Sequence, residues 1–471
     1  MLPPGPSSFP AVQMARWVFN PLPFLRKCAA EHGDMFTLRP AGFPPVVVVT
    51  APSVVREIFT GDPDVLYAGP AKQVLAPTLG QSSLILLDGP AHARHRKLLV
   101  PPLHGERMRH HGESMRAIAD AAIDAWPQGE AFPVYESMQR VSLDVIFRVV
   151  FGFRPEDEST ELEEALLDAT TRPAPILFFP KLHFKRFGPF KRLIDRIAHV
   201  DVGLHAQIAR RRAAPDCAER HDILSTLLQA RDESGVPLTD TEIRDQLITM
   251  LIAGYETTAA TLAWTLYLVL GDPRVYAKLR AELDRVMEGG PLRLERLESL
   301  EYLEATLKEV LRIYPVLPSL ARMLTAPMRV GEYDLPAGVI VMPCSWLTHR
   351  REDLYPEPES FRPERFLEGK PTPYEYYPFG GGARRCIGMA FATYEARVVL
   401  AEILLRAPLR LEPGHVETVK RKSTILAPSG GTRVIMDGPA RPVRPAPGAA
   451  PTNPGSVRSA PSACPHIAGA G

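Results

Sequence analysis

The chain has 471 residues, of which 45% are hydrophobic and 23% are charged, and its formal net charge is +1. This composition is typical of a globular protein, and the near-zero charge excludes the strongly basic surface of a general nucleic-acid binder. The five cysteines are dispersed, so we expect a reducing compartment and no disulfide framework. The opening Met-Leu-Pro-Pro-Gly-Pro has no apolar run that could form a signal peptide or membrane anchor, which favours a cytoplasmic location.

Most of the predicted elements are helices. In chain order, residues 46–50 form a short strand-like run after two prolines. Asp272 and Pro273 predict the start of a helix that continues to residue 287, and residues 300–313 form another amphipathic helix. Residues 328–341 alternate in polarity between turn signals and predict paired strands. The expected fold class is therefore mainly α with small β-sheets.

The longest apolar run, residues 247–270, is long enough to span a bilayer. It contains Glu256 near its middle, and a carboxylate at the centre of a bilayer is costly. The sequence has no second run of this kind. We therefore interpret the segment as the central buried helix of one large domain.

The end of the chain differs in composition from the rest. Residues 438–471 are rich in Pro, Ala and Gly and have almost no large apolar side chain, which predicts a disordered tail after a single domain of residues 1–437. Cys464 and His466 in this tail are candidate metal ligands, but a flexible end is the simpler interpretation.

The most informative segment is residues 379–388, which read Phe-Gly-Gly-Gly-Ala-Arg-Arg-Cys-Ile-Gly. Cys386 follows a glycine-rich loop and precedes an amphipathic stretch from residue 388 to about residue 405. Backbone N–H groups of the loop, the positive end of the helix, and the charges of Arg384 and Arg385 are all expected to favour a thiolate. Such a sulfur is either a nucleophile or a metal ligand.

The surroundings of Cys386 decide between these roles. No histidine lies nearby to act as a base, and no Cys-x-x-Cys pair suggests zinc. A lone thiolate suits the axial position of haem iron, because the porphyrin supplies four further ligands. Phe379, Gly382, Arg384, Cys386 and Gly388 match the Phe-x-x-Gly-x-Arg-x-Cys-x-Gly signature of the cytochrome P450 family at every defined position.

The chain resembles this family from about residue 2 to residue 434. The resemblance implies haem b (iron protoporphyrin IX) as the cofactor and Cys386 as its axial ligand. It also implies a single large haem domain of the cytochrome P450 fold, with haem between the long central helix and the helix after the cysteine loop.

A second motif, Ala-Gly-Tyr-Glu-Thr-Thr at residues 253–258, lies within the apolar helix. Gly254 weakens a helix, Thr257 can bond to a carbonyl one turn earlier, and Glu256 is an acid on an apolar face. Together they predict a local bulge with room for a ligand and water. The alternative is a kinked helix whose acid pairs with an arginine. The segment also resembles the family pattern in which an acid and an alcohol relay protons to dioxygen, which implies catalytic roles for Glu256 and Thr257.

Further charged residues match family positions. The resemblance implies that Glu309, Arg312 and Arg365 form a buried ionic cluster that positions the cysteine loop and takes no part in the reaction. In isolation, a Glu and an Arg three residues apart would be read as a surface pair. His349 is expected to be structural.

Haem carboxylates need cations. His92 and Arg96 are four residues apart, on one face of a predicted helix. The resemblance implies haem-binding residues as follows: His92, Arg96, Arg322, Phe379, Arg384 and Gly388. For each charged member, a solvated side chain is the alternative.

The resemblance also places several apolar segments over the distal face of the haem. The pocket residues it implies are Leu79, Leu84, Ala253, Val316, Leu317 and Ile425. Their apolar character predicts a hydrophobic, mid-sized substrate such as a fatty acid, a terpenoid or a polyketide-like compound. Residues 170–189, which contain several prolines, are predicted to form a mobile lid.

The implied function is that of a haem-thiolate monooxygenase that inserts one oxygen atom from O2 by hydroxylation or epoxidation. The chain has no nucleotide fingerprint and no iron–sulfur cysteines, so a separate ferredoxin or flavodoxin with an NAD(P)H-dependent reductase must supply electrons. We expect this carrier to dock on a basic patch comprising Arg94, Lys97, Arg109, Arg384 and Arg385. We expect a monomer with no nucleic-acid partner and no membrane anchor.

Two alternatives remain at this stage. A haem-thiolate enzyme that uses peroxide, or that does not oxygenate its substrate, would often lack the acid and alcohol, both of which are present here. A haem-binding sensor or carrier is a more remote possibility and would need no proton relay.

Overall fold

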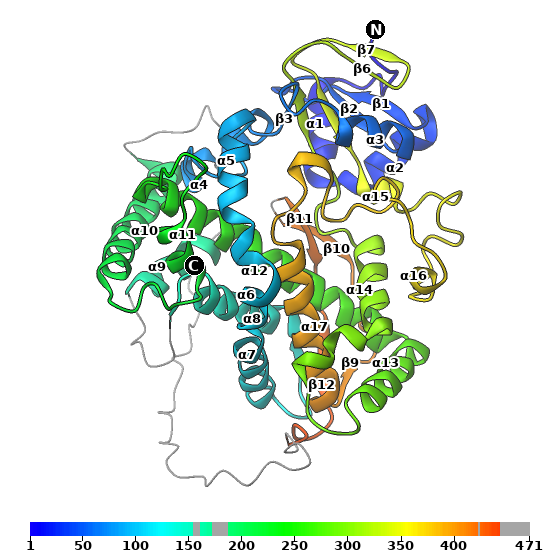
Figure 1. Cartoon of the computed structure of the whole chain (residues 1–471). Helices are drawn as coiled ribbons and strands as arrows, with labels where there is room; N and C mark the ends of the chain where they lie inside the picture. Colours follow the sequence, from blue (N-terminus) through cyan, green and yellow to red (C-terminus); the bar gives the residue numbers. More distant parts are fainter. Residues whose placement is uncertain (154–160, 172–186, 423, 443–471) are drawn as a thin grey trace.

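The computed structural model describes residues 1–153, 161–171, 187–422 and 424–442 (Figure 1). The helices of the first part are α1 (Pro10–Phe19), α2 (Pro21–His32), α3 (Pro52–Thr60), α4 (Ala76–Leu79), α5 (Gly89–Leu99), α6 (Gly105–Arg109), α7 (Gly112–Asp124), α8 (Val134–Val149) and α9 (Glu161–Thr171). Those of the second part are α10 (Gly188–Ala213), α11 (Ile223–Gln229), α12 (Asp240–Gly271), α13 (Pro273–Val286), α14 (Glu301–Ile313), α15 (Ser345–Thr348), α16 (Arg365–Glu368) and α17 (Met389–Arg406). The predicted, mainly helical fold class is confirmed.

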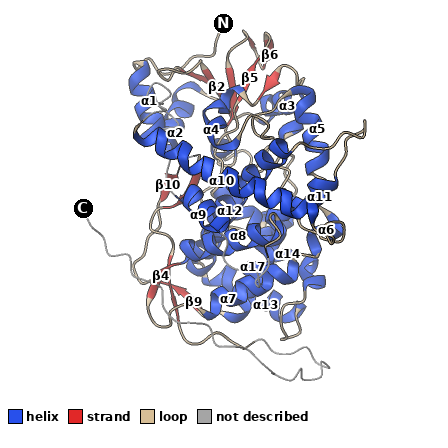
Figure 2. Ribbon diagram, turned by 90° about the vertical axis from the view of Figure 1, so that its left-hand side faces the viewer, coloured by secondary structure: helices blue, strands red, loops and turns tan. Residues whose placement is uncertain are grey.

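The strands form small sheets at the margins of the helical body (Figure 2). The largest sheet has the order β1-β2-β8-β5-β3, with strands β1 (Met35–Leu38), β2 (Val46–Val49), β8 (Ile340–Pro343), β5 (Arg322–Leu324) and β3 (Leu66–Tyr67). A second sheet has the order β4-β12-β9, with β4 (Ala131–Pro133), β12 (Arg433–Met436) and β9 (Leu409–Leu411). Two hairpins complete the set: β6 (Met328–Val330) with β7 (Tyr333–Leu335), and β10 (Val419–Lys422) with β11 (Ile425–Pro428).

The predicted pairing within residues 328–341 is right only in part. β6 and β7 pair across a turn at Gly331, whose φ of +60° suits glycine. β8, however, pairs in parallel with β2 and antiparallel with β5. All four residues of β8 and all four valines of β2 are buried. Strands buried along their whole length occupy the interior of a sheet, where they have a neighbour on each side.

The central helix, α12, begins before the apolar run and is covered by other elements for most of its length. Its start is fixed by a capping box in which the Glu242 N–H donates to the Thr239 hydroxyl (3.2 Å) and the Thr239 N–H donates to the Glu242 carboxylate (2.8 Å). Within the described part of the chain, no helix combines the length and the apolar character needed to cross a membrane. The prediction of a central buried helix is confirmed.

The predicted bulge in this helix is wrong, because α12 runs as an unbroken α-helix through residues 253–258. Gly254 has a packing role instead: a Cβ at this position would lie 2.8 Å from Cδ1 of Ile146 on α8. The Thr257 and Thr258 hydroxyls donate to carbonyls four residues earlier, at 2.7 Å and 3.0 Å, while the helix continues. The glycine therefore lets α8 approach α12 closely.

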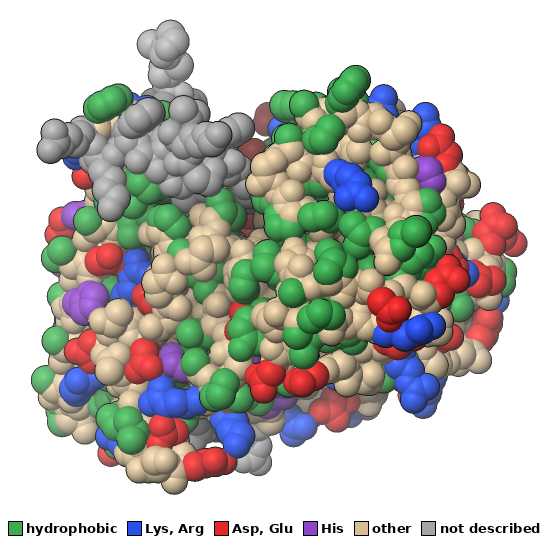
Figure 3. Space-filling view, turned by 90° about the horizontal axis from the view of Figure 1, so that it is seen from above, with side chains coloured by type: hydrophobic (Ala, Val, Ile, Leu, Met, Phe, Trp, Pro, Cys, Tyr) green, Lys and Arg blue, Asp and Glu red, His purple; other side chains and the backbone are tan. Residues whose placement is uncertain are grey.

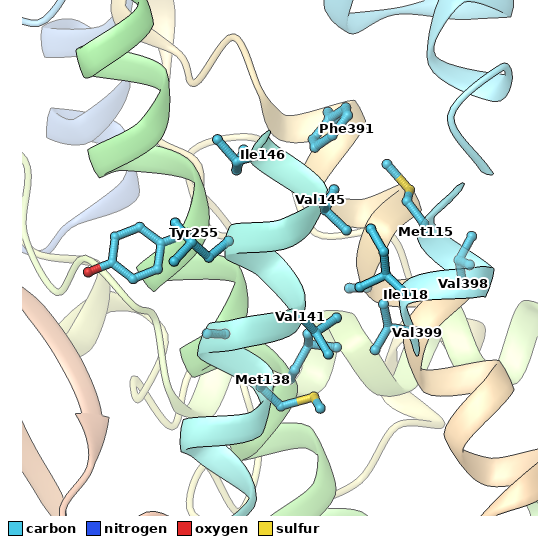
Figure 4. Packing of buried hydrophobic residues seen from close by; sticks show 14 of the residues in the cluster. Met115, Ile118, Met138, Val141, Val145, Ile146, Tyr255, Phe391, Val398 and Val399 are labelled. Atoms are coloured by element: carbon cyan, nitrogen blue, oxygen red, sulfur yellow. The ribbon is translucent and has the colours of Figure 1, made fainter. Parts of the chain in front are cut away.

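Helix α8 lies between α12 on one side and α7 and α17 on the other (Figure 4). Val145 and Ile146 of α8 belong to the same buried cluster as Tyr255 of α12, Met115 of α7 and Phe391 of α17. Each aliphatic side chain buried in this way contributes roughly 1.5–3 kcal/mol relative to exposure. This packing holds α12 and α17 at a fixed separation, and the candidate site lies between them.

Helices α13 and α14 confirm two of the sequence predictions. The Asp272 side chain caps α13 by accepting from the N–H groups of Arg274 (3.0 Å) and Val275 (3.2 Å). The residue at the N-cap of α14 provides no side-chain hydrogen bond. Instead, the carboxylate of Glu282 on α13 accepts a hydrogen bond from the N–H of Tyr302 at 2.7 Å. Because a neighbouring helix supplies this cap, the direction of α14 is fixed relative to α13.

The outer surface carries charges of both signs. On the face seen in Figure 3, Lys and Arg side chains are interspersed with Asp and Glu, and hydrophobic side chains lie between them.

Near the end of the described chain, the Arg441 N–H donates to the Arg406 carbonyl on α17 (2.8 Å). Most of the predicted lid and tail, at residues 172–186 and 443–471 and including Cys464 and His466, lies outside the described residues.

Candidate active site

A cavity of about 1660 Å³ lies between α12 and the loop of residues 379–388 that leads into α17. Ligand pockets usually measure about 300–1000 Å³. The cavity therefore has room for a large planar cofactor and a second molecule together. The apolar residues predicted from the sequence all line it, namely Leu79, Leu84, Ala253, Val316, Leu317 and Ile425.

Cys386 lines this cavity at the end of a tightly folded loop. Its N–H donates to the Phe379 carbonyl at 2.9 Å, which closes the loop. Gly382 has a φ of +64°, and a side chain there would also collide with the backbone of Phe59 on α3. Gly388 follows as the N-cap of α17. The glycines therefore let the loop pack against α3 while Cys386 faces the opening.

The prediction that the local environment favours a thiolate needs correction. Burial among protein atoms raises the pKa of the Cys386 thiol, even though its side chain is exposed to the cavity. The N–H of Gly388 and the charges of Arg96 and Arg385 act in the opposite direction, as the sequence predicts, but the direction of the net shift is upward. A positive metal ion at the sulfur reverses this balance, since a coordinating thiol is deprotonated.

Four predicted haem-binding side chains gather at one edge of the cavity. Arg96 on α5 donates to the Arg385 carbonyl at 2.8 Å, and Arg384 contacts Asp88 and the Leu84 carbonyl. Burial lowers the pKa of Arg322 and of Arg384 to about 10. Positive charge is therefore concentrated away from bulk water, where it is costly without anions.

His92 also lines this edge, but unlike the arginines it carries no charge near pH 7. Burial, with a contribution from the charge of Arg96, lowers the pKa of His92 to about 4. His92 is consequently neutral near pH 7 in this structure and offers a hydrogen bond instead of a charge.

The sequence analysis assigned no haem-binding role to Lys72, which lines the same edge of the cavity. Burial and the nearby charges of Arg322 and Arg384 lower the pKa of Lys72 to about 7. Within the described residues, neither Lys72 nor Arg322 has an acidic partner. Lys72 belongs to no motif, so only the fold could reveal it. Asp88 pairs with Arg384. In the sequence, the only indication of a role for Asp88 is its position before Gly89 and Pro90 at the start of α5.

Glu256 and Thr257 of α12 line the cavity together with Ala253. The Thr257 hydroxyl donates to the Ala253 carbonyl at 2.7 Å. The Glu256 side chain is 18% exposed, and its carboxylate lies 2.9 Å from Nζ of Lys422 on β10. The acid is thus paired with a lysine, whereas the alternative considered from the sequence was an arginine.

Glu309, Arg312 and Arg365 lie together behind the cavity and do not line it. Glu309 accepts from Arg312 Nε at 2.7 Å and from Arg365 Nε at 3.0 Å. Arg312 also donates to the carbonyls of His349 (2.9 Å) and Pro358 (2.7 Å), so both charges of the central pair are satisfied away from water. His349 is itself buried and accepts from the N–H of Tyr377 at 3.0 Å, two residues before Phe379. The cluster therefore braces the start of the cysteine loop.

The residues around the cavity fit a haem group. They provide the thiol of Cys386, a mainly apolar lining, and an edge with buried cations, of which Lys72 and Arg322 have no acidic partner in the part of the chain that the structure describes. Haem has the matching shape and charge: a flat macrocycle, an iron that takes an axial thiolate, and two carboxylates.

Comparison with known proteins decides the family, because the sequence model of the cytochrome P450 family matches residues 3–436. The chain belongs to the cytochrome P450 family. It is 40% identical to "Putative cytochrome P450 135B1" of Mycobacterium tuberculosis over 436 residues, which is 92% of this chain and 91% of that protein. It is 36% identical to "Putative cytochrome P450 135A1" of the same species over 438 residues, covering 92% of this chain and 95% of that protein.

A solved structure supports the fold of this cytochrome P450. A cyanobacterial CYP120A1 with bound retinoic acid superposes with a TM-score of 0.82 and 25% sequence identity, covering 93% of this chain and 99% of that one. Membership of the family means that haem is the cofactor and that the chain is a monooxygenase-type oxidoreductase, which uses dioxygen, a redox partner and a hydrophobic substrate.

The structure corrects one expectation about this cytochrome P450, the basic docking patch. Four of its five predicted cations are paired with acids: Arg94 with Asp232 and Glu242, Lys97 with Glu233, Arg109 with Glu298, and Arg384 with Asp88. The acids come from segments distant in sequence, so the pairing could not be read from the positions of the cations. The predicted surface is therefore largely neutralised.

Proposed function

We propose that this cytochrome P450 inserts one oxygen atom from O2 into a hydrophobic, mid-sized substrate by hydroxylation or epoxidation. The single observation that carries the proposal is the arrangement of the cavity, with Cys386 on one side and Glu256 and Thr257 of α12 on the other. The lining between them is mainly apolar, as expected for such a substrate. The retinoic acid bound by the CYP120A1 structure is a molecule of this size and character.

In this proposal Cys386 ligates the haem iron, and the cationic edge binds the two haem carboxylates. Arg96, Arg322 and Arg384 contribute charge, and His92 contributes a hydrogen bond. Lys72 joins this set, since binding of an anion next to it favours its protonated form. Once bound, haem supplies the chemistry that activates dioxygen. The ionic cluster of Glu309, Arg312 and Arg365 holds the cysteine loop in place.

Glu256 and Thr257 handle protons in this proposal. The Glu256 carboxylate is partly exposed and therefore able to exchange protons with water, while the Thr257 hydroxyl lines the cavity. The hydroxyl now donates to the Ala253 carbonyl, so it can also accept a hydrogen bond from inside the cavity. The presence of both groups favours the use of dioxygen over the peroxide-dependent alternative.

The electron donor in this proposal is a separate ferredoxin or flavodoxin with its reductase. Because four of the five cations predicted to dock the carrier are paired with acids, docking depends less on a general positive patch than the sequence suggests. Of the cations predicted to dock the carrier, only the exposed Arg385 forms no ion pair within the described residues. We therefore expect a modest salt dependence of electron transfer.

Two measurements test the proposal. The reduced protein with carbon monoxide should show the red-shifted absorption of a thiolate ligand, and Cys386→Ser should abolish it. Turnover with a surrogate ferredoxin pair under ¹⁸O2 should place one labelled atom in the product of a hydrophobic substrate that shifts the haem spin state. Binding of such substrates without any oxygenated product would contradict the proposal and favour a carrier.

A further inference from the structure

Glu256, the acid proposed to handle protons, pairs with a residue from a distant part of the chain. Glu256 Oε1 lies 2.9 Å from Nζ of Lys422, with side chains that are 18% and 41% exposed. Glu256 belongs to α12, and Lys422 is the last residue of β10. Ion pairs that are partly exposed to solvent add little net stability, so this contact can open and close without disturbing the fold.

Lys422 belongs to the β10–β11 hairpin, which borders the substrate cavity. In the register of β10 and β11, Lys422 pairs with Ile425, and Ile425 lines the cavity together with Thr424 and Lys422 itself. A molecule that contacts Ile425 in the cavity therefore also acts on Lys422, its partner on the neighbouring strand. The pairing of Lys422 with Ile425 thus connects the wall of the cavity to Glu256.

A second contact holds the ammonium group in this position. Nζ of Lys422 lies 5.8 Å from the centroid of the Tyr135 ring, within the range of a cation–π interaction. Burial, with a smaller contribution from Glu256, raises the pKa of Tyr135, so the ring remains a neutral phenol. Lys422 thus lies between an aromatic ring of α8 and the carboxylate of α12.

We propose that Lys422 is a positioning residue that couples occupancy of the substrate cavity to the orientation of Glu256. With the cavity empty, the ion pair holds the carboxylate against the hairpin. A substrate that displaces Ile425 and, with it, Lys422 weakens the pair and leaves the carboxylate able to turn toward the cavity. Such a substrate shifts the equilibrium because it binds the open arrangement more tightly. The inference rests on the proposed role of Glu256 in proton delivery.

The test uses three variants of the haem-loaded enzyme. Lys422→Gln removes the charge, Lys422→Arg keeps it, and Lys420→Gln removes a charge from the same strand at an exposed position that forms no ion pair within the described residues. Lys422→Gln should raise NADPH consumption without substrate several-fold and lower the product formed per NADPH. Lys422→Arg keeps the charge, so its NADPH consumption and its product per NADPH should stay close to those of the native enzyme. Lys420→Gln should leave both values unchanged.

A measurement on the resting protein separates positioning from catalysis. In hydrogen–deuterium exchange without substrate or electrons, Lys422→Gln and Glu256→Gln should each speed exchange at residues 424–426, and Lys420→Gln should not. Unchanged exchange at these residues, or equal uncoupling in Lys420→Gln, would overturn the inference. If the native enzyme forms product and Lys422→Gln shows normal coupling, the role of Lys422 is rejected. The proposed monooxygenase function then remains intact.

Discussion

Glu309 of α14 and Arg365 of α16 are joined by a hydrogen-bonded ion pair of 3.0 Å that connects two segments behind the cysteine loop. The same carboxylate binds Arg312, and the exposed fractions of the Glu309 and Arg312 side chains are both 0%. This relationship explains how a loop rich in glycine can hold a fixed position, because the rigidity comes from the charged groups that brace it.

The first prediction concerns this cluster. Glu309→Gln should destabilise the protein by about 3–5 kcal/mol, because it leaves two guanidinium groups buried without their anion. Glu304→Gln is a matched control on the same helix, where the pair with Lys308 (2.7 Å) is partly exposed and is expected to contribute less than about 1 kcal/mol. Chemical denaturation and the haem content of the purified variants measure both effects. Equal losses in the two variants would contradict a bracing role.

The second prediction concerns Thr257. Thr257→Ala should uncouple electron use from product formation and raise the release of hydrogen peroxide, since it removes the hydroxyl next to Glu256 in the cavity lining. Thr265→Ala provides the control: its hydroxyl also bonds to a carbonyl of α12 (2.7 Å), but it does not line the cavity. The ratio of product to NADPH consumed is the measurement. Unchanged coupling in Thr257→Ala would count against a proton relay at this position.

The third prediction concerns Lys72. Burial and the charges of Arg322 and Arg384 lower the pKa of Lys72 to about 7, and a neighbouring carboxylate would raise it again. Above about pH 7, binding of haem must therefore take up a proton, and haem affinity should fall by up to about tenfold per pH unit. Titration of the apoprotein with haem at several pH values measures this slope.

Lys72→Met should weaken haem binding near neutral pH and flatten that dependence on pH. Lys97→Met serves as the control, because Lys97 is exposed and paired with Glu233 at the surface. An equally steep loss of affinity with pH in Lys72→Met would show that another group takes up the proton.

The fourth prediction concerns Glu395 of α17, which is buried beside Ser142 of α8. Burial raises the pKa of Glu395 to about 8, whereas an unfolded glutamate loses its proton near pH 4.3. Between these values the folded state binds more protons than the unfolded state, so stability falls as pH rises from about 4 to about 8. The cost at pH 7 is on the order of 3 kcal/mol.

Glu395→Gln keeps the size and removes the titration, so it should raise the unfolding temperature at pH 8 and reduce the dependence of stability on pH. The measurement is thermal unfolding at several pH values, compared with Glu304→Gln as a variant that changes a partly exposed, paired acid. A variant that is no more stable than the native protein at pH 8 would contradict a neutral, buried carboxyl group.

The features that the sequence predicted best are those that depend on neighbouring residues. The helix start at Asp272, the central buried helix and the glycine-rich loop around Cys386 are local patterns, and the structure contains each of them. The bulge near Gly254 was predicted wrongly because the glycine meets Ile146 of another helix, which no local pattern records.

Charge pairing shows the same limit. Positions of Arg94, Lys97 and Arg109 suggested a basic surface, but the acids that neutralise them come from other segments. The pairing of β8 with β2, and the contact of Lys422 with Glu256, likewise join residues far apart in the chain.

The amino-acid order alone determined the family, the cysteine that can hold haem and the mainly helical architecture, because each is written in short motifs or in the periodicity of single helices. Only the tertiary structure decided which charges are neutralised, that Lys72 joins the cationic edge, and that a lysine from a hairpin reaches the acid of the central helix. These outcomes depend on which surfaces come together when the core is buried, and the resulting distances set the desolvation and the charge interactions of each group.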